Sequence, residues 1–168
     1  KVFGNRIGLN SAGTAAFANG LGGIQIHTAS GDDGSYNTIG GPSQGNTISG
    51  NNGPGIAITG DGTAHDNVLS TNLIGVNAAG TAALPNTLGV SIFGTGNTVG
   101  GTVASSGNVI SGNTTHGVVI SGNMSTGNKL YSNNIGLNIN SNAKLGNGGA
   151  GVFLDGASDN RLGDLEVN

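Results

Sequence analysis

The carboxylates of Asp32, Asp33 and Asp61 are the side chains whose type and spacing most readily suggest chemistry. Two carboxylates at a defined separation can cleave a glycosidic bond, and carboxylate oxygens are ligands that Ca²⁺ prefers. The segments GDDG and GDG that carry them are also typical of tight turns, in which Asp binds its own backbone. Two interpretations therefore stand: a calcium site formed by the three carboxylates, or separate turns.

The other reactive side chains form no recognisable catalytic or cofactor-binding pattern. His27, His65 and His116 lack the close spacing of metal ligands and are interpreted as solvated loop residues. Ser49 and Ser111 occupy equivalent positions, but no base shares their register, which favours hydroxyls at strand ends. The chain has no cysteine, so disulfides and thiolate chemistry are excluded. We expect no catalytic residue and no cofactor other than calcium.

An internal repeat sets the positions of all these residues. The pattern asparagine, any residue, apolar residue recurs at steps of 30, 30, 31 and 32 residues. It begins at Asn37, Asn67, Asn97, Asn128 and Asn160, and Lys1 replaces the asparagine in an earlier copy. Each period contains three short apolar segments that alternate with period 2 and end in Gly, Asn or Ser. Three strands per turn, repeated at constant length, predict a solenoid of parallel strands.

The predicted fold is therefore all-β: a parallel β-helix with three short strands per turn of about 30 residues and about five and a half turns. Strands of successive turns stack about 4.8 Å apart, so equivalent apolar residues should form columns in a narrow core. The first column is Phe3, Ile39, Leu69, Val99, Leu130 and Leu162; the second is Ile7, Ile48, Ile74, Ile110 and Ile135; the third is Ile24, Ile56, Val90, Val118 and Val152.

Asparagines should stack as regularly as the apolar residues. The most regular set lies three residues after each isoleucine of the second column and comprises Asn10, Asn51, Asn77, Asn113 and Asn138. Asparagine tolerates the left-handed backbone of a corner, and its amide can bond to the amides above and below it. We expect these five residues to form a structural ladder. Two further ladders are expected to begin at Asn5 and Asn37.

Long and short connections alternate between turns. The segments IGLNSAGTAAFANG, from Ile7, and IGVNAAGTAALPNT, from Ile74, are near copies, and a looser copy starts at Ile135. Short ISGN connections separate them. This alternation predicts a bulge on one flank at every other turn, with Phe17 or Leu84 folding back over the core.

The phrases NTIGG, GNTISGN, GIAITG, NLIGVNAAGTAALPN and GNKLYSNNIG resemble the right-handed parallel β-helix repeats of large bacterial secreted and cell-surface proteins, which have the pectate-lyase-like superfamily fold. The resemblance covers the whole chain and implies a right-handed solenoid outside the cell or on its surface. The catalytic motifs of that superfamily are absent. The lyase sites of that superfamily combine acidic Ca²⁺ ligands with a nearby Lys or Arg. In this chain, Arg6 is the one candidate for such a basic neighbour of the three aspartates.

Charge and hydropathy limit the partners. The five basic residues are scattered and the net charge is −3, so nucleic acid is not an expected partner. No apolar run approaches the roughly 18–20 residues that span a bilayer, so no membrane insertion is expected. Residues 1–168 should form one β-helix domain. No polar cap is visible at either end, and open strand edges invite pairing. We therefore expect a segment of a longer solenoid, or a unit that assembles end to end with itself.

Three functional hypotheses remain open. The first is a non-enzymatic structural or adhesive solenoid segment of a bacterial surface or filament-forming protein, located extracellularly or on the cell surface. The second is a carbohydrate-active β-helix, lyase-like or hydrolase-like, whose groove uses Asp32, Asp33, Asp61 and Arg6. The third is a carbohydrate-binding module that binds glycans on the third column and its following loops.

Overall fold

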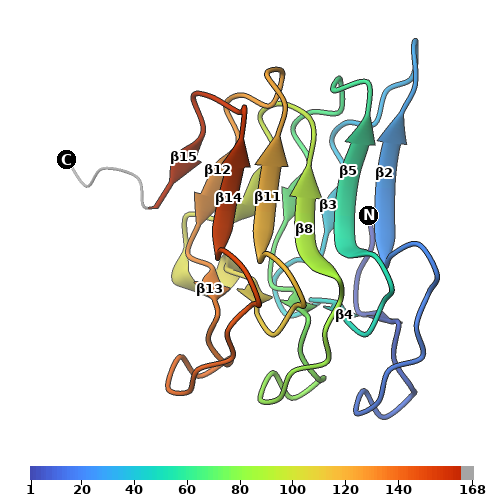
Figure 1. Cartoon of the computed structure of the whole chain (residues 1–168), viewed down its shortest axis with the longest axis vertical. Coiled ribbons are helices and arrows are strands. Elements are labelled where there is room, and N and C mark those ends of the chain that lie inside the picture. Colours follow the sequence, from blue (N-terminus) through green and yellow to red (C-terminus); the bar gives the residue numbers. More distant parts are fainter. Residues whose placement is uncertain (164–168) are drawn as a thin grey trace.

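The computed structural model describes residues 1–163, which form three parallel sheets around one core (Figure 1). The first sheet contains β3 (Thr38–Ile39), β6 (Val68–Leu69), β9 (Thr98–Gly100), β12 (Lys129–Tyr131) and β15 (Arg161–Leu162). The second contains β1 (Arg6–Ile7), β4 (Thr47–Ile48), β7 (Leu73–Ile74), β10 (Val109–Ile110) and β13 (Asn134–Ile135). The third contains β2 (Ile24–Thr28), β5 (Pro54–Gly60), β8 (Leu88–Ile92), β11 (Val118–Ser121) and β14 (Val152–Asp155).

The chain visits the three sheets in rotation, so every hydrogen-bonded neighbour of a strand lies one turn away. A single 3₁₀ turn, η1 (Ala104–Ser106), interrupts this order between β9 and β10. Within residues 1–163, no helix is long and apolar enough to cross a membrane. The predicted parallel β-solenoid with three strands per turn is confirmed.

The predicted number of turns is wrong. The isoleucines that begin and end the core column of the second sheet, Ile7 and Ile135, are 128 residues apart and are separated by four circuits of about 32 residues. The described chain therefore makes about four turns rather than five and a half. One reason is that Val2, in the first copy of the repeat, forms only an isolated bridge with Ile39. The four circuits between Ile7 and Ile135 also average about 32 residues rather than about 30.

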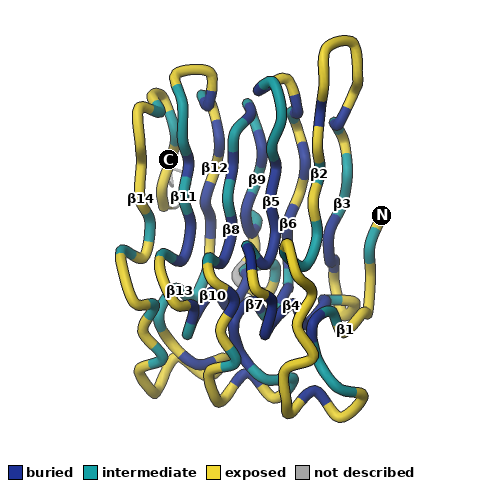
Figure 2. The backbone as a smooth tube through the Cα atoms, turned by 45° about the vertical axis from the view of Figure 1, so that its right-hand side comes forward, coloured by how far each residue is buried: buried dark blue, intermediate teal, exposed yellow. Residues whose placement is uncertain are grey.

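The core columns have the predicted register. Ile39 pairs with Leu69, Ile48 with Ile74, and Ile56 with Val90, and the neighbouring turns repeat these pairings. Successive residues of a strand point to opposite faces, so one correct pairing places every apolar side chain of that strand inside. The buried side chains form one continuous core, and the members of the core columns become more exposed towards the two ends of the solenoid (Figure 2). In the first turn the register differs, because Val2 and not Phe3 lies beside Ile39.

Asparagine ladders run along all three corners. Two have the predicted members: Asn5, Asn46, Asn72, Asn108 and Asn133 in one, and Asn37, Asn67, Asn97, Asn128 and Asn160 in the other. In each ladder the amide Nδ2 donates to Oδ1 of the asparagine one turn later, at 2.9–3.1 Å. The backbone N–H of the donor residue binds the same oxygen, as between Asn46 and Asn72 at 3.1 Å.

The third ladder differs from the predicted set of Asn10, Asn51, Asn77, Asn113 and Asn138. Only Asn51 and Asn113 belong to it, and the observed sequence of rungs is Asn19, Asn51, Asn86, Asn113 and Asn147. The other three asparagines accept hydrogen bonds within their own loops, from Thr14 N, Thr81 N and Asn142 N respectively. An inserted loop in those turns moves the ladder position further along the chain.

Each of those loops is a short antiparallel hairpin (residues 8–17, 75–84 and 136–145), closed by the bridges Leu9–Ala16, Val76–Ala83 and Leu137–Lys144. The hairpins project side by side from one flank at every other turn (Figure 1). Their tips bond to one another, because Ala78 N donates to Gly13 O and Ile139 N donates to Gly80 O, both at 2.9 Å. The predicted alternation is confirmed. Phe17, however, is 70% exposed and does not fold over the core.

Candidate functional site

Asp61 follows β5 and accepts a cluster of hydrogen bonds. Its Oδ1 accepts from Thr63 Oγ1 at 2.6 Å, from Thr28 Oγ1 at 2.7 Å and from Thr63 N at 3.1 Å. The hydroxyl of Thr63, and next that of Thr28, holds the pKa of Asp61 below its ordinary value, because both donate to the charged form. Thr28 ends β2, so the carboxylate ties two successive turns of the third sheet together.

Acid should weaken this tie. The pKa of Asp61 is depressed in the folded state, so its contribution to stability is complete above the unfolded pKa of about 3.9 and disappears as the pH falls through the folded value. Between about pH 5 and about pH 2, thermal melts should therefore show a steeper fall of Tm for the natural chain than for Asp61→Asn. If Tm falls equally with pH in the two proteins, the Asp61 carboxylate does not contribute to stability.

Asp32 and Asp33 lie in the loop after β2, and each binds its own loop backbone. Asp32 Oδ2 accepts from Ala29 N at 3.3 Å, and Asp33 Oδ1 accepts from Ser35 N at 3.0 Å. Within residues 1–163, no group of three His, Cys, Asp or Glu side chains is placed to share a metal ion. These bonds fit the turn interpretation of GDDG and GDG.

The calcium site stays a prediction that melting can test. If the three aspartates bind Ca²⁺, millimolar Ca²⁺ should raise Tm relative to a chelator, because the ion binds the folded state preferentially. The substitution Asp33→Ala should remove that rise. An identical Tm in Ca²⁺ and in chelator would contradict the calcium interpretation.

The three histidines lie at separate places on the surface. His27 Nδ1 lies 3.3 Å from Thr59 Oγ1 on the outer face of the third sheet. His65 Nδ1 lies 3.0 Å from Asp66 Oδ2, with the ring of Tyr36 edge-on at 5.2 Å. His116 Nδ1 accepts from Ala150 N at 3.0 Å. Each ring thus binds groups of its own corner or of the next turn.

Ser49 and Ser111 have a structural role that sequence reasoning missed. Ser49 Oγ donates to Val76 O at 2.8 Å and accepts from Gly75 N at 2.9 Å. Ser111 repeats this arrangement with Leu137 O and Gly136 N, two turns later. Both serines therefore fix the start of the hairpin in the following turn. The signal in the sequence is that serine follows the second-column isoleucine only in the turns that precede a hairpin.

Replacing Ser49 with alanine should reduce the free energy of unfolding by about 1–2 kcal/mol, because two hydrogen bonds are lost at a fully buried position. Urea titration measures the change. Ser91→Ala removes a hydroxyl from the outer face of β8 and should change stability by less than about 0.5 kcal/mol. Equal losses for the two variants would show that the bonds to the hairpin carry no net stability.

The outer face of the second sheet is hollowed between two rows of loops. Thr47 and Val109 point outwards yet are only 9% and 6% exposed. One hollow lies beside Arg6 and Thr47, and another of about 270 Å³ is lined by residues that include Leu73, Val109 and Ile139. Arg6 Nη1 donates to Ser11 O of the first hairpin at 2.6 Å. Arg6 thus belongs to the second sheet, whereas the three candidate aspartates follow strands of the third.

The outer face of the third sheet carries an aromatic pair. The rings of His116 and Phe153 stack at a centroid distance of 5.0 Å and an interplanar angle of 16°. Phe153 is 43% exposed, and its neighbour on β11 is Val119. A flat aromatic plate on an open sheet offers area for a planar or ring-shaped ligand.

The geometry thus contains turn-capping carboxylates, serines and asparagines that serve the fold, and two surface features, the hollows of the second sheet and the aromatic pair of the third. Comparisons of the chain with known protein families, with curated proteins and with solved structures returned no match.

Proposed function

We propose that this chain is a non-enzymatic structural solenoid, a stiff segment of an extracellular or cell-surface protein of bacteria. The observation that carries the proposal is the use of its buried polar groups. Within residues 1–163, every buried side-chain nitrogen or oxygen has a hydrogen-bond partner. The ladder asparagines bind one another, and Ser49 and Ser111 bind the hairpins. Such groups are committed to architecture rather than held ready for a substrate.

Stiffness follows from the same contacts. Adjacent turns are joined by three parallel sheets and by three amide ladders, so bending would stretch backbone and side-chain hydrogen bonds together. The hairpins add backbone bonds between alternate turns on one flank. The likeness of the repeats to those of bacterial surface proteins supports an extracellular setting.

Two measurements test the proposal. Incubation with neutral and anionic polysaccharides should release no reducing ends and no unsaturated products, and antibodies raised against the chain should label intact cells of its source. A product that disappears in an Asp61→Asn or Arg6→Ala variant would overturn the non-enzymatic role. Labelling seen only after the cells are opened would overturn the surface location.

The aromatic pair favours glycan binding as a second candidate function. A sugar ring can stack on the exposed face of Phe153, which the ring of His116 supports from behind. A glycan array would test this: hits that Phe153→Ala abolishes would support it. Phe17→Ala is the matched control, because it removes an exposed phenylalanine from the hairpin flank. Hits that survive Phe153→Ala would place binding elsewhere.

A further inference from the structure

The ladders give the two ends of the solenoid opposite hydrogen-bonding character. Every rung before the last of each ladder donates through Nδ2 to the Oδ1 of the following turn, as Asn5, Asn19 and Asn37 do. At the last turn, Asn133, Asn147 and Asn160 each use one Nδ2 hydrogen on a carbonyl of the preceding turn, and residues 1–163 supply no Oδ1 for the second. At the first turn, the Oδ1 atoms of Asn5 and Asn19 find no donor within the same residues. Any turn that docks must therefore carry asparagines in register.

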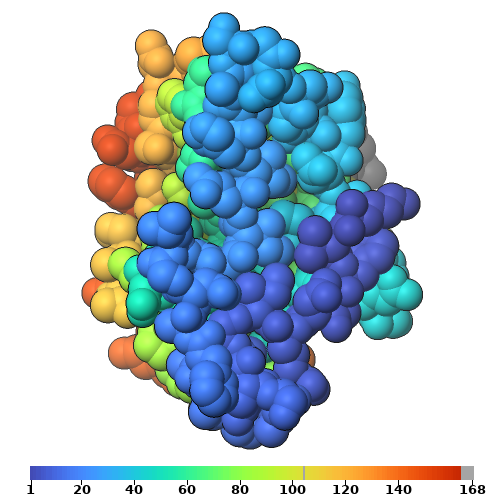
Figure 3. All heavy atoms as spheres, turned by 90° about the vertical axis from the view of Figure 1, so that its right-hand side faces the viewer, coloured from blue at the N-terminus to red at the C-terminus, as the bar shows by residue number. Residues whose placement is uncertain are grey.

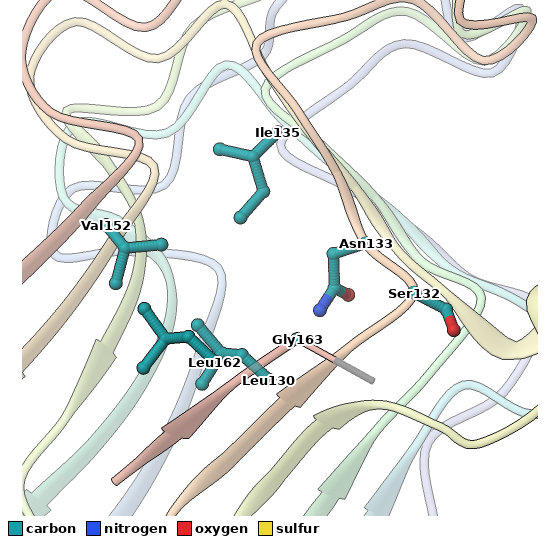
Figure 4. A pocket seen from close by; sticks show the side chains of 7 residues that line it. All are labelled: Leu130, Ser132, Asn133, Ile135, Val152, Leu162 and Gly163. Carbon is teal, nitrogen blue, oxygen red and sulfur yellow. The ribbon is translucent and has the colours of Figure 1, made fainter. Parts of the chain in front are cut away.

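Apolar surface accompanies these donors at the last turn. A hollow of about 280 Å³ is lined by Leu130, Ile135, Val152 and Leu162, whose side chains point into it beside Asn133 (Figure 4). Ile135, Val152 and Leu162 are the last members of the three core columns, and Leu130 lies one turn before Leu162. The opposite end presents the first turn, with its hairpin and the start of the third sheet, towards the viewer in Figure 3. Exposed Phe3, Phe17 and Leu21 belong to that turn.

The hairpins decide which kind of turn fits. Between each pair of hairpins lies a Ser-Gly-Asn corner, called here a short corner (residues 49–51 and 111–113). Gly50 N donates to Leu84 O of the following hairpin at 3.0 Å, and a Cβ on Gly50 would lie 2.6 Å from Ala16 Cβ of the preceding one. Gly112 is enclosed in the same way by Ala83 and Leu145. A short corner is therefore held between two hairpins, with no room for a side chain.

Hairpins on adjacent turns would collide. The hairpin tips already meet across the intervening short corner, through Ala78 N to Gly13 O and Ile139 N to Gly80 O. Each tip thus occupies the height of two turns, roughly 9.6 Å by the strand spacing. The first and last described turns both carry a hairpin, so a direct head-to-tail contact between two copies would place hairpin on hairpin.

We propose that both ends of the described solenoid are docking surfaces for one kind of partner, a β-solenoid turn with a short corner. That partner carries asparagine at the three ladder positions, aliphatic residues in the core columns, and Ser-Gly-Asn at the corner. Docked before the first turn, its serine would bind Leu9 O and Gly8 N, as Ser49 binds Val76 O and Gly75 N. The inference goes beyond the scaffold role and does not depend on it. It replaces the expected direct end-to-end assembly of identical copies.

The chain itself supplies a matched pair of test segments. Residues 40–69 form a full circuit with a short corner, and residues 70–99 form a full circuit with a hairpin; both have 30 residues and end at a core residue of the first sheet, Leu69 and Val99 respectively. Each circuit is fused directly after Leu162, in place of the residues that follow, and a chain ending at Leu162 is the baseline. Thermal melting gives Tm, and hydrogen exchange gives the protection of the added amides.

The short-corner circuit should raise Tm by at least about 5 °C within a single transition, and its amides should be protected. The hairpin circuit should leave Tm near the baseline and exchange freely. Equal protection of both circuits, or protection of neither, would overturn the proposal. Sedimentation of the unmodified chain is a further measurement. A monomer is expected, and linear assemblies that grow with concentration would show that identical copies do dock directly.

Discussion

Replacing Asn86 with alanine should reduce the free energy of unfolding by about 3–5 kcal/mol. Its Oδ1 accepts from Asn51 N at 3.1 Å and from Asn51 Nδ2 at 2.8 Å, and its Nδ2 donates to Ile48 O at 2.9 Å and to Asn113 Oδ1 at 3.2 Å. The side chain is fully buried, so water cannot replace these partners without opening the corner. Urea titration with a common m-value measures the loss.

Asn77→Ala is the matched control, because Asn77 belongs to the ladder predicted from sequence but lies in the hairpin. It loses acceptance from Thr81 N and Ala82 N at the rim of the loop, a contact comparable to a helix cap and worth about 1 kcal/mol. If the two variants lose similar stability, the third ladder does not carry the energy that its burial implies.

Gly75→Ala should cost about 2–5 kcal/mol. Gly75 begins the middle hairpin with φ of +85°, a left-handed conformation that costs other residues about 1–2 kcal/mol. A Cβ there would also overlap Ser111 O and Asn113 Oδ1 of the next turn. Two turns would have to separate, which is the overpacking penalty of about 1–3 kcal/mol. Thermal and urea unfolding of the variant give the loss.

The variant Gly136→Ala separates the cost of backbone strain from the cost of a steric clash between turns. Gly136 begins the last hairpin with a similar φ of +81°, but the nearest atom to an added Cβ is Gly146 Cα at 3.9 Å. This variant should lose only the conformational cost of about 1–2 kcal/mol. A loss as large as that of Gly75→Ala would mean that backbone strain alone, and not contact between turns, explains both glycines.

The core could be predicted from sequence because its signal is local and repeated. Strand segments such as GIAI and GVVI alternate with period 2, and their spacing identifies which residues stack. The two ladders that begin at Asn5 and Asn37 could be predicted from the same repeat spacing, because their asparagines come just before the short strands of the second and first sheets. In each case the asparagine lies two residues before the core residue whichever type of turn contains it.

The third ladder could not be found by counting forward from the second column. After Ile48 and Ile110 a short corner follows, and the third residue along is a ladder asparagine. After Ile7, Ile74 and Ile135 the third residue is also asparagine, but it opens a hairpin and the ladder position comes nine residues later at Asn19 and Asn86. Counting back from the third column comes closer, since Asn19 and Asn51 lie five residues before Ile24 and Ile56, whereas Asn86 lies four residues before Val90.

The candidate site was less predictable, because loops rather than strands position it. Register placed Asp32, Asp33 and Asp61 at the same ends of neighbouring strands, which was sufficient to suggest a shared ion. The partners of each carboxylate depend on loop conformation and on hydroxyls such as Thr28 and Thr63, and no periodic signal encodes them. Loops also line the hollows on the outer face of the second sheet, so no periodic signal in the sequence encodes those hollows.

The bonds between hairpin tips also have a consequence for how the solenoid unfolds. In a simple stacked-repeat protein each unit interacts only with its immediate neighbours, so the array behaves as a one-dimensional chain with nearest-neighbour coupling. Here Gly13 is bonded to Ala78, and Gly80 to Ile139, across a whole intervening turn. Releasing an inner turn that carries a hairpin would therefore break contacts with its second neighbours as well as its first. We therefore expect the smallest cooperative unit of this array to be two turns, so that fraying from either end proceeds in steps of two turns.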